Sequence, residues 1–175
     1  MSRAAPFATR LPPGSAILAA HSSAGYADSF AQPVRGTPFV DALQAYLSMR
    51  TRAPRWINRL LALRDALAGC VGMTRTDGFS RRAERPSSLA AGDPLDFFRV
   101  LSVEPRELAM ALDDRHFRVV VSLYLDEAEG RPQLVVISSA VAPRSRLGRT
   151  YVALIAPFHR QVVKAMLRRL ASGAA

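Results

Sequence analysis

Cysteine and long hydrophobic runs are both nearly absent from this sequence. Cys70 is the only cysteine among 175 residues, which excludes a disulfide framework and a cluster of thiolate metal ligands. The longest apolar stretch, residues 134–142, contains two serines and is much shorter than the ~18 residues that a transmembrane helix needs. The amino-terminal apolar run, residues 16–20, is too short for a signal peptide. We therefore expect a cytoplasmic protein without a membrane span.

Lysine is scarce too, and this affects how the charge is interpreted. The net charge is +10, but Lys164 is the only lysine among 24 basic residues. The arginines are dispersed along the chain, without a block of about five or six basic residues and without interleaved aromatic residues that could stack on bases. We therefore expect a solvated basic surface and regard nucleic acid as the less favoured partner.

The common motifs of catalysis and cofactor binding are missing as well. The chain has no GxGxxG or Walker loop, no HExxH and no GxSxG elbow. Its three histidines, His21, His116 and His159, do not have the spacing of metal ligands. The sequence therefore predicts no cofactor and no metal, and it leaves open whether the protein is an enzyme.

The patterns that are present predict one domain of the α+β class. A chain of 175 residues with 49% hydrophobic content is expected to form a single core. Residues 1–24 are rich in Ala, Pro and Ser without a lasting period, so we expect a loosely ordered leader before a domain over residues 25–172. Residues 26–30 have the alternation of a first strand.

Two helices are expected after this strand. Thr37 and Pro38 are typical of a helix start, and apolar residues follow them at helical spacing. A second helix begins at Pro54 and carries a broad apolar face, with Trp56 expected to anchor it against the sheet. Residues 74–94 are rich in Gly, Pro, Ser and Arg, which predicts a long loop.

A period of two then replaces the helical period. It predicts strands over residues 97–104, 107–112, 116–126 and 133–142, and their short connections require antiparallel neighbours. Residues 148–171 are helical and amphipathic. The expected fold is thus α+β, with a curved antiparallel sheet of about five or more strands, two helices inserted after the first strand, and a long C-terminal helix packed on the sheet.

Four segments of the chain carry a family resemblance. They are residues 26–30, 54–56 with 60–65, 113–118, and 147–151 with 155–160. Through them the chain resembles an uncharacterised bacterial family, domain-of-unknown-function family 2867, over about residues 15 to 170. The order of elements also resembles the helix-grip fold of START-like lipid-transfer and polyketide-cyclase-like proteins. That resemblance implies an apolar cavity between the sheet and the last helix, whereas the family has no established function and implies no catalytic residues.

His159 is the most distinctive polar residue of the last helix. It lies about 80° around the helix from the first aromatic residue of the apolar arc. Three candidates for a ligand site share this arc with it: Tyr151, Ile155 and Phe158. A histidine beside a cavity could act as a base or orient a ligand, with Asp28 or Asp114 as its carboxylate partner. The simpler alternative is a core histidine that is hydrogen-bonded to a strand.

Polar residues also alternate along the strand expected over residues 116–126. His116, Arg118 and Tyr124 share one face of it, and the apolar residues other than Val120 share the opposite face. If the polar face points outward, it is an ordinary solvated surface. If the sheet curls the other way, the same residues form a polar wall of a ligand site.

The basic segment before the last helix is a further candidate. Arg144, Arg146 and Arg149 flank the expected helix start, where free N–H groups and the helix dipole attract anions. The alternative is a basic loop without a bound ion.

Three functions are consistent with this sequence. The leading hypothesis is a domain that binds a small hydrophobic molecule in a pocket between the C-terminal helix and the sheet. The first alternative is a cyclase-like or hydrolytic enzyme that uses His159 with a carboxylate. The second is a structural or protein-interaction domain. Each of the three is compatible with an oligomer.

Overall fold

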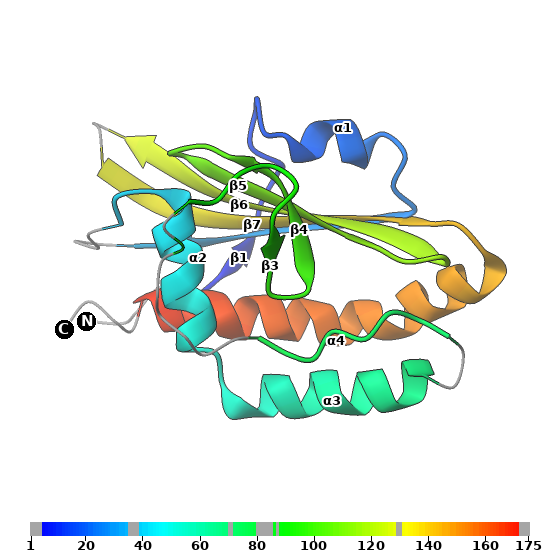
Figure 1. Cartoon of the computed structure of the whole chain (residues 1–175). Coiled ribbons are helices and arrows are strands. Elements are labelled where there is room, and N and C mark those ends of the chain that lie inside the picture. The colour runs from blue at the N-terminus through cyan, green and yellow to red at the C-terminus, as the bar shows by residue number, and fades with distance from the viewer. Residues whose placement is uncertain are drawn as a thin grey trace.

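A curved sheet of seven antiparallel strands is the centre of the fold in the residues that this computed structural model describes, 5–34, 39–69, 72–79, 86, 88–128 and 131–171 (Figure 1). The strands are β1 (Phe7–Ala8), β2 (Tyr26–Pro33), β3 (Pro94–Leu95), β4 (Phe98–Val103), β5 (Glu107–Asp113), β6 (Phe117–Ala128) and β7 (Arg131–Pro143). Their order in the sheet is β1-β2-β7-β6-β5-β4-β3. The predicted α+β class and antiparallel sheet are confirmed. The edge strands β1 and β3 were not predicted, because two residues cannot display a period.

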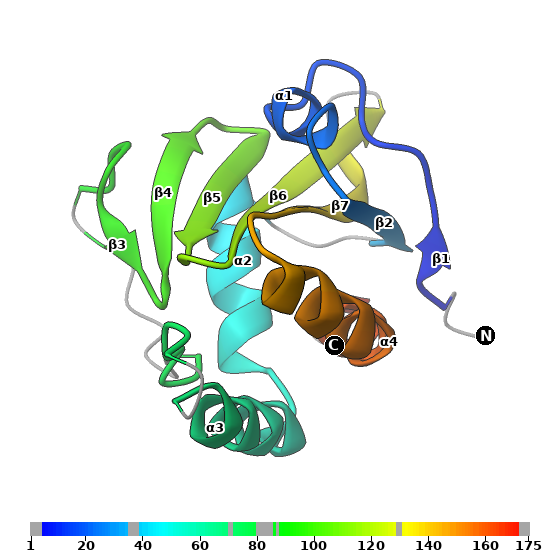
Figure 2. The ribbon, with the colours of Figure 1, turned by 90° about the vertical axis from the view of Figure 1, so that its right-hand side faces the viewer.

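Four helices cover the described sheet, one on one face and three on the other. They are α1 (Ile17–His21), α2 (Ala42–Thr51), α3 (Arg55–Gly69) and α4 (Arg146–Ala171). Figures 1 and 2 show α1 alone on one face, with α2 and α4 against the opposite face. Helix α3 runs alongside α4 and lies farther from the sheet than α4 does (Figure 2). The predicted long C-terminal helix on the sheet is confirmed.

The hydrophobic core is filled under only one half of α4. In the C-terminal half, Val163, Met166, Leu167 and Leu170 are buried against the sheet and α2. In the N-terminal half, by contrast, the apolar residues are half-buried or exposed. Because the helix pattern is amphipathic throughout, this difference means that the sheet-facing side of the first half of α4 borders space rather than packed side chains.

The expected leader over residues 1–24 is folded from residue 5 onward. Strand β1 pairs with β2, and Ile17 in α1 is fully buried with Val120 and Ala140 of the sheet. The reason is a long-range polar contact: the carboxylate of Glu107 accepts hydrogen bonds from the Ser15 hydroxyl and, at 3.0 Å, from the Ala16 N–H. Such a contact leaves no local period in the sequence. The division at residue 24 therefore does not separate a loose leader from the fold.

The start of α2 and the environment of Trp56 on α3 differ from the expected ones. Thr37 and Pro38 lie outside the described residues, and the N-cap of α2 is Asp41, whose Oδ1 accepts a hydrogen bond from Gln44 N–H at 2.8 Å. The prediction that Trp56 anchors α3 is wrong, because its side chain is 44% exposed. Helix α3 stands away from the sheet, so most of its apolar stripe faces a cavity and solvent instead of a core. Cys70 lies outside the described residues.

Candidate functional site

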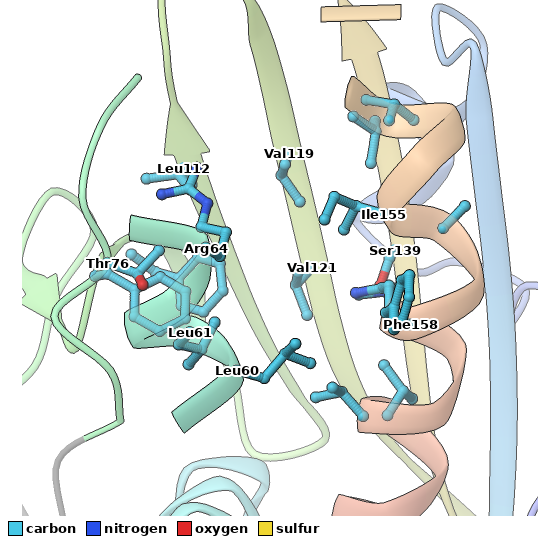
Figure 3. A pocket seen from close by; sticks show the side chains of 18 of the residues that line it. Leu60, Leu61, Arg64, Thr76, Leu112, Val119, Val121, Ser139, Ile155 and Phe158 are labelled. Carbon is cyan, nitrogen blue, oxygen red and sulfur yellow. The ribbon is translucent and has the colours of Figure 1, made fainter. Parts of the chain in front are cut away.

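A cavity of about 520 Å³ lies between α3, α4 and the face of the sheet that α2 and α4 cover (Figure 3). Its walls are almost wholly apolar. They include Leu60 and Leu61 of α3, Leu112 of β5, Val119 and Val121 of β6, and Ile155 and Phe158 of α4. The odd positions of β6 supply one wall because side chains alternate along a strand. The volume is within the usual range of small-molecule sites, about 300 to 1,000 Å³.

Polar contacts hold α3 in place beside the cavity. The carboxylate of Asp65 accepts hydrogen bonds from Thr76 N–H at 2.9 Å and from Asp77 N–H at 2.9 Å. Nearer the start of the helix, Asn58 Oδ1 accepts a hydrogen bond from Phe79 N–H at 3.1 Å. These bonds join α3 to the segment that follows it rather than to the sheet. Helix α3 is therefore tied by polar contacts to the segment beside it, and the apolar side chains between α3 and the sheet do not close the space.

Arg64 forms one polar corner of the cavity. It occupies the middle of the apolar stripe of α3, and its Nε donates a hydrogen bond to the Tyr151 hydroxyl at 2.8 Å. Its NH1 pairs with Asp65 at 2.8 Å and also donates to the Thr74 carbonyl. Burial alone lowers the pKa of Arg64, but its bonds with Tyr151 and Asp65 outweigh burial and raise it. Arg64 is thus a buried, paired cation that links α3 to α4.

His159 and Ser139 form a second polar corner on the α4 side. Their Nε2 and Oγ atoms are 3.0 Å apart. Asp28 on β2 is the cross-strand partner of Ser139 on β7, so its carboxylate lies behind the same ring, with Oδ1 3.6 Å from Nε2 of His159. The other oxygen, Oδ2, accepts a hydrogen bond from the Tyr26 hydroxyl at 2.5 Å. Strand register and one turn of α4 thus bring together four polar residues from three separate segments, β2, β7 and α4.

The electrostatics of this corner favour an ionised Asp28. Burial raises the pKa of Asp28, but the interactions with His159, Tyr26 and Arg160 outweigh it, so the pKa of this carboxyl is lowered. Burial and the bond to Asp28 raise the pKa of Tyr26 to about 12. Asp28 Oδ1 is buried and has no hydrogen-bond partner among the described residues, since 3.6 Å is too long for one. A carboxylate at this distance favours the tautomer with the proton on Nε2.

The structure brings together some of the predicted site residues. Tyr151, Ile155, Phe158 and His159 all line the cavity, and Asp28 lies directly behind His159. The polar face of β6 does not line it. Arg118 is half-buried and pairs with Asp113, and Tyr124 is half-buried with Arg106 stacked 5.4 Å from its ring centroid. The row of polar residues on β6 therefore belongs to the α1 side of the sheet and is not a wall of this cavity.

Asp114 and His116 do not line the cavity but lie in the turn beside the start of α4. Asp114 accepts hydrogen bonds from the N–H groups of Thr74 at 2.6 Å and His116 at 2.8 Å. The Nδ1 atom of His116 is 3.0 Å from the Ser145 hydroxyl, which caps α4 by accepting the Gly148 N–H at 3.0 Å. Asp114 is therefore not the carboxylate partner of His159.

The basic segment before α4 is partly neutralised by neighbouring acids. Arg144 pairs with Asp113 at 2.8 Å and donates to the carbonyl of Asp114 at 2.9 Å. Arg146 and Arg149 are exposed. Anion binding by these arginines stays a prediction, although the Ser145 cap already uses one of the N–H groups that an anion would need.

Sequence reasoning missed Arg64 and Ser139, although both left a signal. Arg64 lies on the apolar arc of its helix, as His159 does on its own. Ser139 interrupts an otherwise apolar strand. A polar residue at a position that the period assigns to the interior is the signal that both share with His159.

The described residues contain neither a cluster of metal ligands nor a helix that could span a membrane. Within those ranges, His, Cys, Asp and Glu side chains do not gather in groups of three or more that could hold a metal ion. In the same part of the chain, every helix is too short or too polar to cross a membrane.

Comparison with known proteins relates the chain to one family and to a solved structure. No curated protein matches it. A Rhodobacter sphaeroides protein, whose crystal structure was determined by a structural genomics consortium, is 15% identical, with 95% of each chain covered and a TM-score of 0.41. A family match covers residues 20–166, most of the chain. The chain thus belongs to the family described as "Protein of unknown function (DUF2867)".

Proposed function

We propose that this protein binds a small hydrophobic molecule that carries hydrogen-bond acceptors, in the cavity between α3, α4 and the sheet. The observation that carries the proposal is the cavity itself, about 520 Å³ with almost wholly apolar walls. Water inside such a space finds few polar partners, so an apolar molecule that replaces it is favoured. A curved sheet, a long helix and an apolar cavity between them are also what the helix-grip resemblance implies.

The polar groups of the cavity favour a ligand with acceptors rather than donors. In the tautomer with the proton on Nε2, His159 donates a hydrogen bond to Ser139 Oγ. The hydroxyl proton of Ser139 then points elsewhere and has no acceptor among the described residues. Tyr151 accepts a hydrogen bond from Arg64, which leaves its own proton available in the same way. Two hydroxyl donors on separate walls suit carbonyl, ether or carboxylate oxygens on an apolar body.

The enzyme hypothesis is supported by one part of this geometry and weakened by another. His159 lies near a carboxylate and a hydroxyl beside a cavity, which is a setting for acid–base chemistry. However, Ser139 and Asp28 both approach Nε2 of the same ring. In a serine-hydrolase triad the carboxylate holds the other nitrogen, so that Nε2 can accept the serine proton. Binding is therefore the better-supported function, and general acid–base catalysis by His159 is the alternative.

A thermal-shift experiment with matched compounds tests the proposal. Apolar ring compounds that carry a ketone or carboxylate should raise the melting temperature more than the parent hydrocarbons do. Ser139→Ala and Tyr151→Phe should each reduce the extra shift that the oxygen gives, whereas Tyr124→Phe, outside the cavity, should not. The melting temperature of each ligand-free variant is the reference for its own shift. Equal shifts for hydrocarbon and ketone in every variant would contradict the assignment of the donors.

A further inference from the structure

The opening of the cavity is surrounded by exposed apolar side chains on α3 and α4. Leu63 and Leu67 of α3 are 58% and 67% exposed, and Leu154 and Phe158 of α4 are 67% and 52% exposed. All four also line the cavity, so they lie where it opens to solvent. The described ranges contain ten exposed large hydrophobic residues, and six of them are on these two helices. The six are the four residues above together with Trp56 of α3 and Leu147 of α4. We call these six residues the α3–α4 face.

The α3–α4 face continues along a stripe of each helix. Trp56, Leu63 and Leu67 are spaced seven and four residues apart, which places them within about 40° of one another around α3. Leu147, Leu154 and Phe158 have the same spacing along α4. The two helices run alongside each other in both views of the fold (Figures 1 and 2). Two apolar stripes therefore flank one opening.

The charge of the protein is concentrated on the same two helices. Together α3 and α4 contain nine basic residues and one acidic residue, a net charge of +8, whereas the rest of the chain has 15 basic and 13 acidic residues, a net charge of +2. The one acidic residue, Asp65, is buried and paired with Arg64. The charges that these helices expose to solvent are therefore all positive, and they include Arg55 and Arg59 beside the stripe of α3 and Arg146 and Arg168 on α4.

We propose that the α3–α4 face is a docking surface for a lipid bilayer that contains anionic lipids. Exposed apolar residues on helices whose exposed charges are all positive match the two properties of such a bilayer, its apolar interior and its negative surface. A nucleic acid would match the arginines but not the six apolar side chains at the centre of the surface. When the protein is docked in this way, its cavity opens toward the acyl chains, where hydrophobic molecules dissolve. The proposal does not depend on which molecule the cavity holds.

The only tryptophan of the chain lies in this face and reports on docking. Full-length protein is mixed at low salt with vesicles of phosphatidylcholine alone or of phosphatidylcholine with phosphatidylglycerol. We expect co-sedimentation and a blue shift of the Trp56 emission with the anionic vesicles, and much weaker binding to the neutral ones. Emission should also be quenched by lipids with brominated acyl chains.

Surface variants with matched controls locate the contact. Arg55→Gln with Arg59→Gln should weaken binding to anionic vesicles roughly 30-fold, since each basic residue near a membrane surface contributes about a factor of five. Leu63→Ser with Leu154→Ser should weaken it about tenfold or more. Two controls away from the face, Arg10→Gln with Arg99→Gln and Val40→Ser, remove exposed residues of the same kinds and should change binding by less than about twofold.

Three results would overturn the proposal. The first is a wild-type protein that does not sediment with anionic vesicles at low salt, which would leave a protein as the occupant of the face. The second is vesicle binding that neither shifts the Trp56 emission nor responds to Leu63→Ser with Leu154→Ser. The third is a duplex oligonucleotide that binds more tightly than the vesicles and is lost in the Arg55 and Arg59 variant. Because Arg55 and Arg59 do not line the cavity, ligand shifts in solution remain a separate test of the proposed function.

Discussion

Val121→Phe should stabilise this protein, although the same change in a packed core destabilises. Val121 is on β6 with its side chain at the wall of the cavity. A phenylalanine there adds four carbon atoms that can enter the space without displacing neighbours. At about 0.8 kcal/mol for each buried carbon, reduced because part of the ring stays unpacked and because side-chain freedom is lost, the net gain in free energy of unfolding is roughly 1 kcal/mol.

Val135→Phe is the matched control. Val135 is on the neighbouring strand β7, is fully buried in the filled half of the core and does not line the cavity. Overpacking at such a site costs about 1 to 3 kcal/mol. Chemical denaturation of both variants should therefore give changes of opposite sign, and the melting temperatures should move in opposite directions. A Val121→Phe protein that is destabilised as much as Val135→Phe would show that the space is filled in solution, and the cavity would have to be abandoned.

Three further changes test other parts of the structure. Ile57→Ala should lower the free energy of unfolding by about 2 to 5 kcal/mol and Trp56→Ala by about 1 kcal/mol or less, because Ile57 is fully buried and Trp56 is not. Equal losses in the two variants would instead place Trp56 and α3 against the sheet. Gly148→Ala should cost about 2 kcal/mol or more, because a Cβ there collides with the His116 carbonyl. Gly69→Ala at the end of α3 meets no atom and should be neutral or stabilising. If melting experiments gave the reverse order of stabilities, the close packing of the start of α4 on His116 would be refuted. Because the pKa of Asp28 is lowered on folding, its carboxylate stabilises the protein above the unfolded pKa of about 4, and this stabilisation is lost as the pH falls below that value. Asp28→Asn should therefore flatten the dependence of the free energy of unfolding on pH in this acidic range. An unchanged pH dependence would argue against an ionised Asp28.

The sheet and the long helix were predictable because their periods are long and regular. The alternation from Phe117 to Leu125 correctly indicated that one face of β6 is apolar, and the apolar arc of residues 148–171 indicated the side of α4 that faces the sheet. His159 stood out for the same reason, as a polar residue at an interior position. Its predicted neighbours Tyr151, Ile155 and Phe158 line the same cavity because they share one helix.

Contacts between distant segments could not be predicted in this way. Asp28 faces Ser139 through the register of β2 with β7, which no local pattern specifies. Residues 5–24 are held by Ser15 and Glu107, which are far apart in the sequence. Trp56 was assigned to the core because an apolar stripe usually marks buried surface, whereas this stripe borders an opening. The period shows which residues share a face, but not whether anything covers it.

Calorimetric titration of the protein with an apolar ketone selected by thermal shift measures binding to the cavity directly. We expect saturable one-to-one binding with a negative heat-capacity change, because apolar surface is buried in the cavity. Filling the cavity with Val121→Phe and Ile155→Phe together should weaken binding at least tenfold, while the exposed control Leu101→Phe should leave it unchanged within about twofold. Undiminished affinity in the filled variant would contradict the claim that this cavity is the binding site.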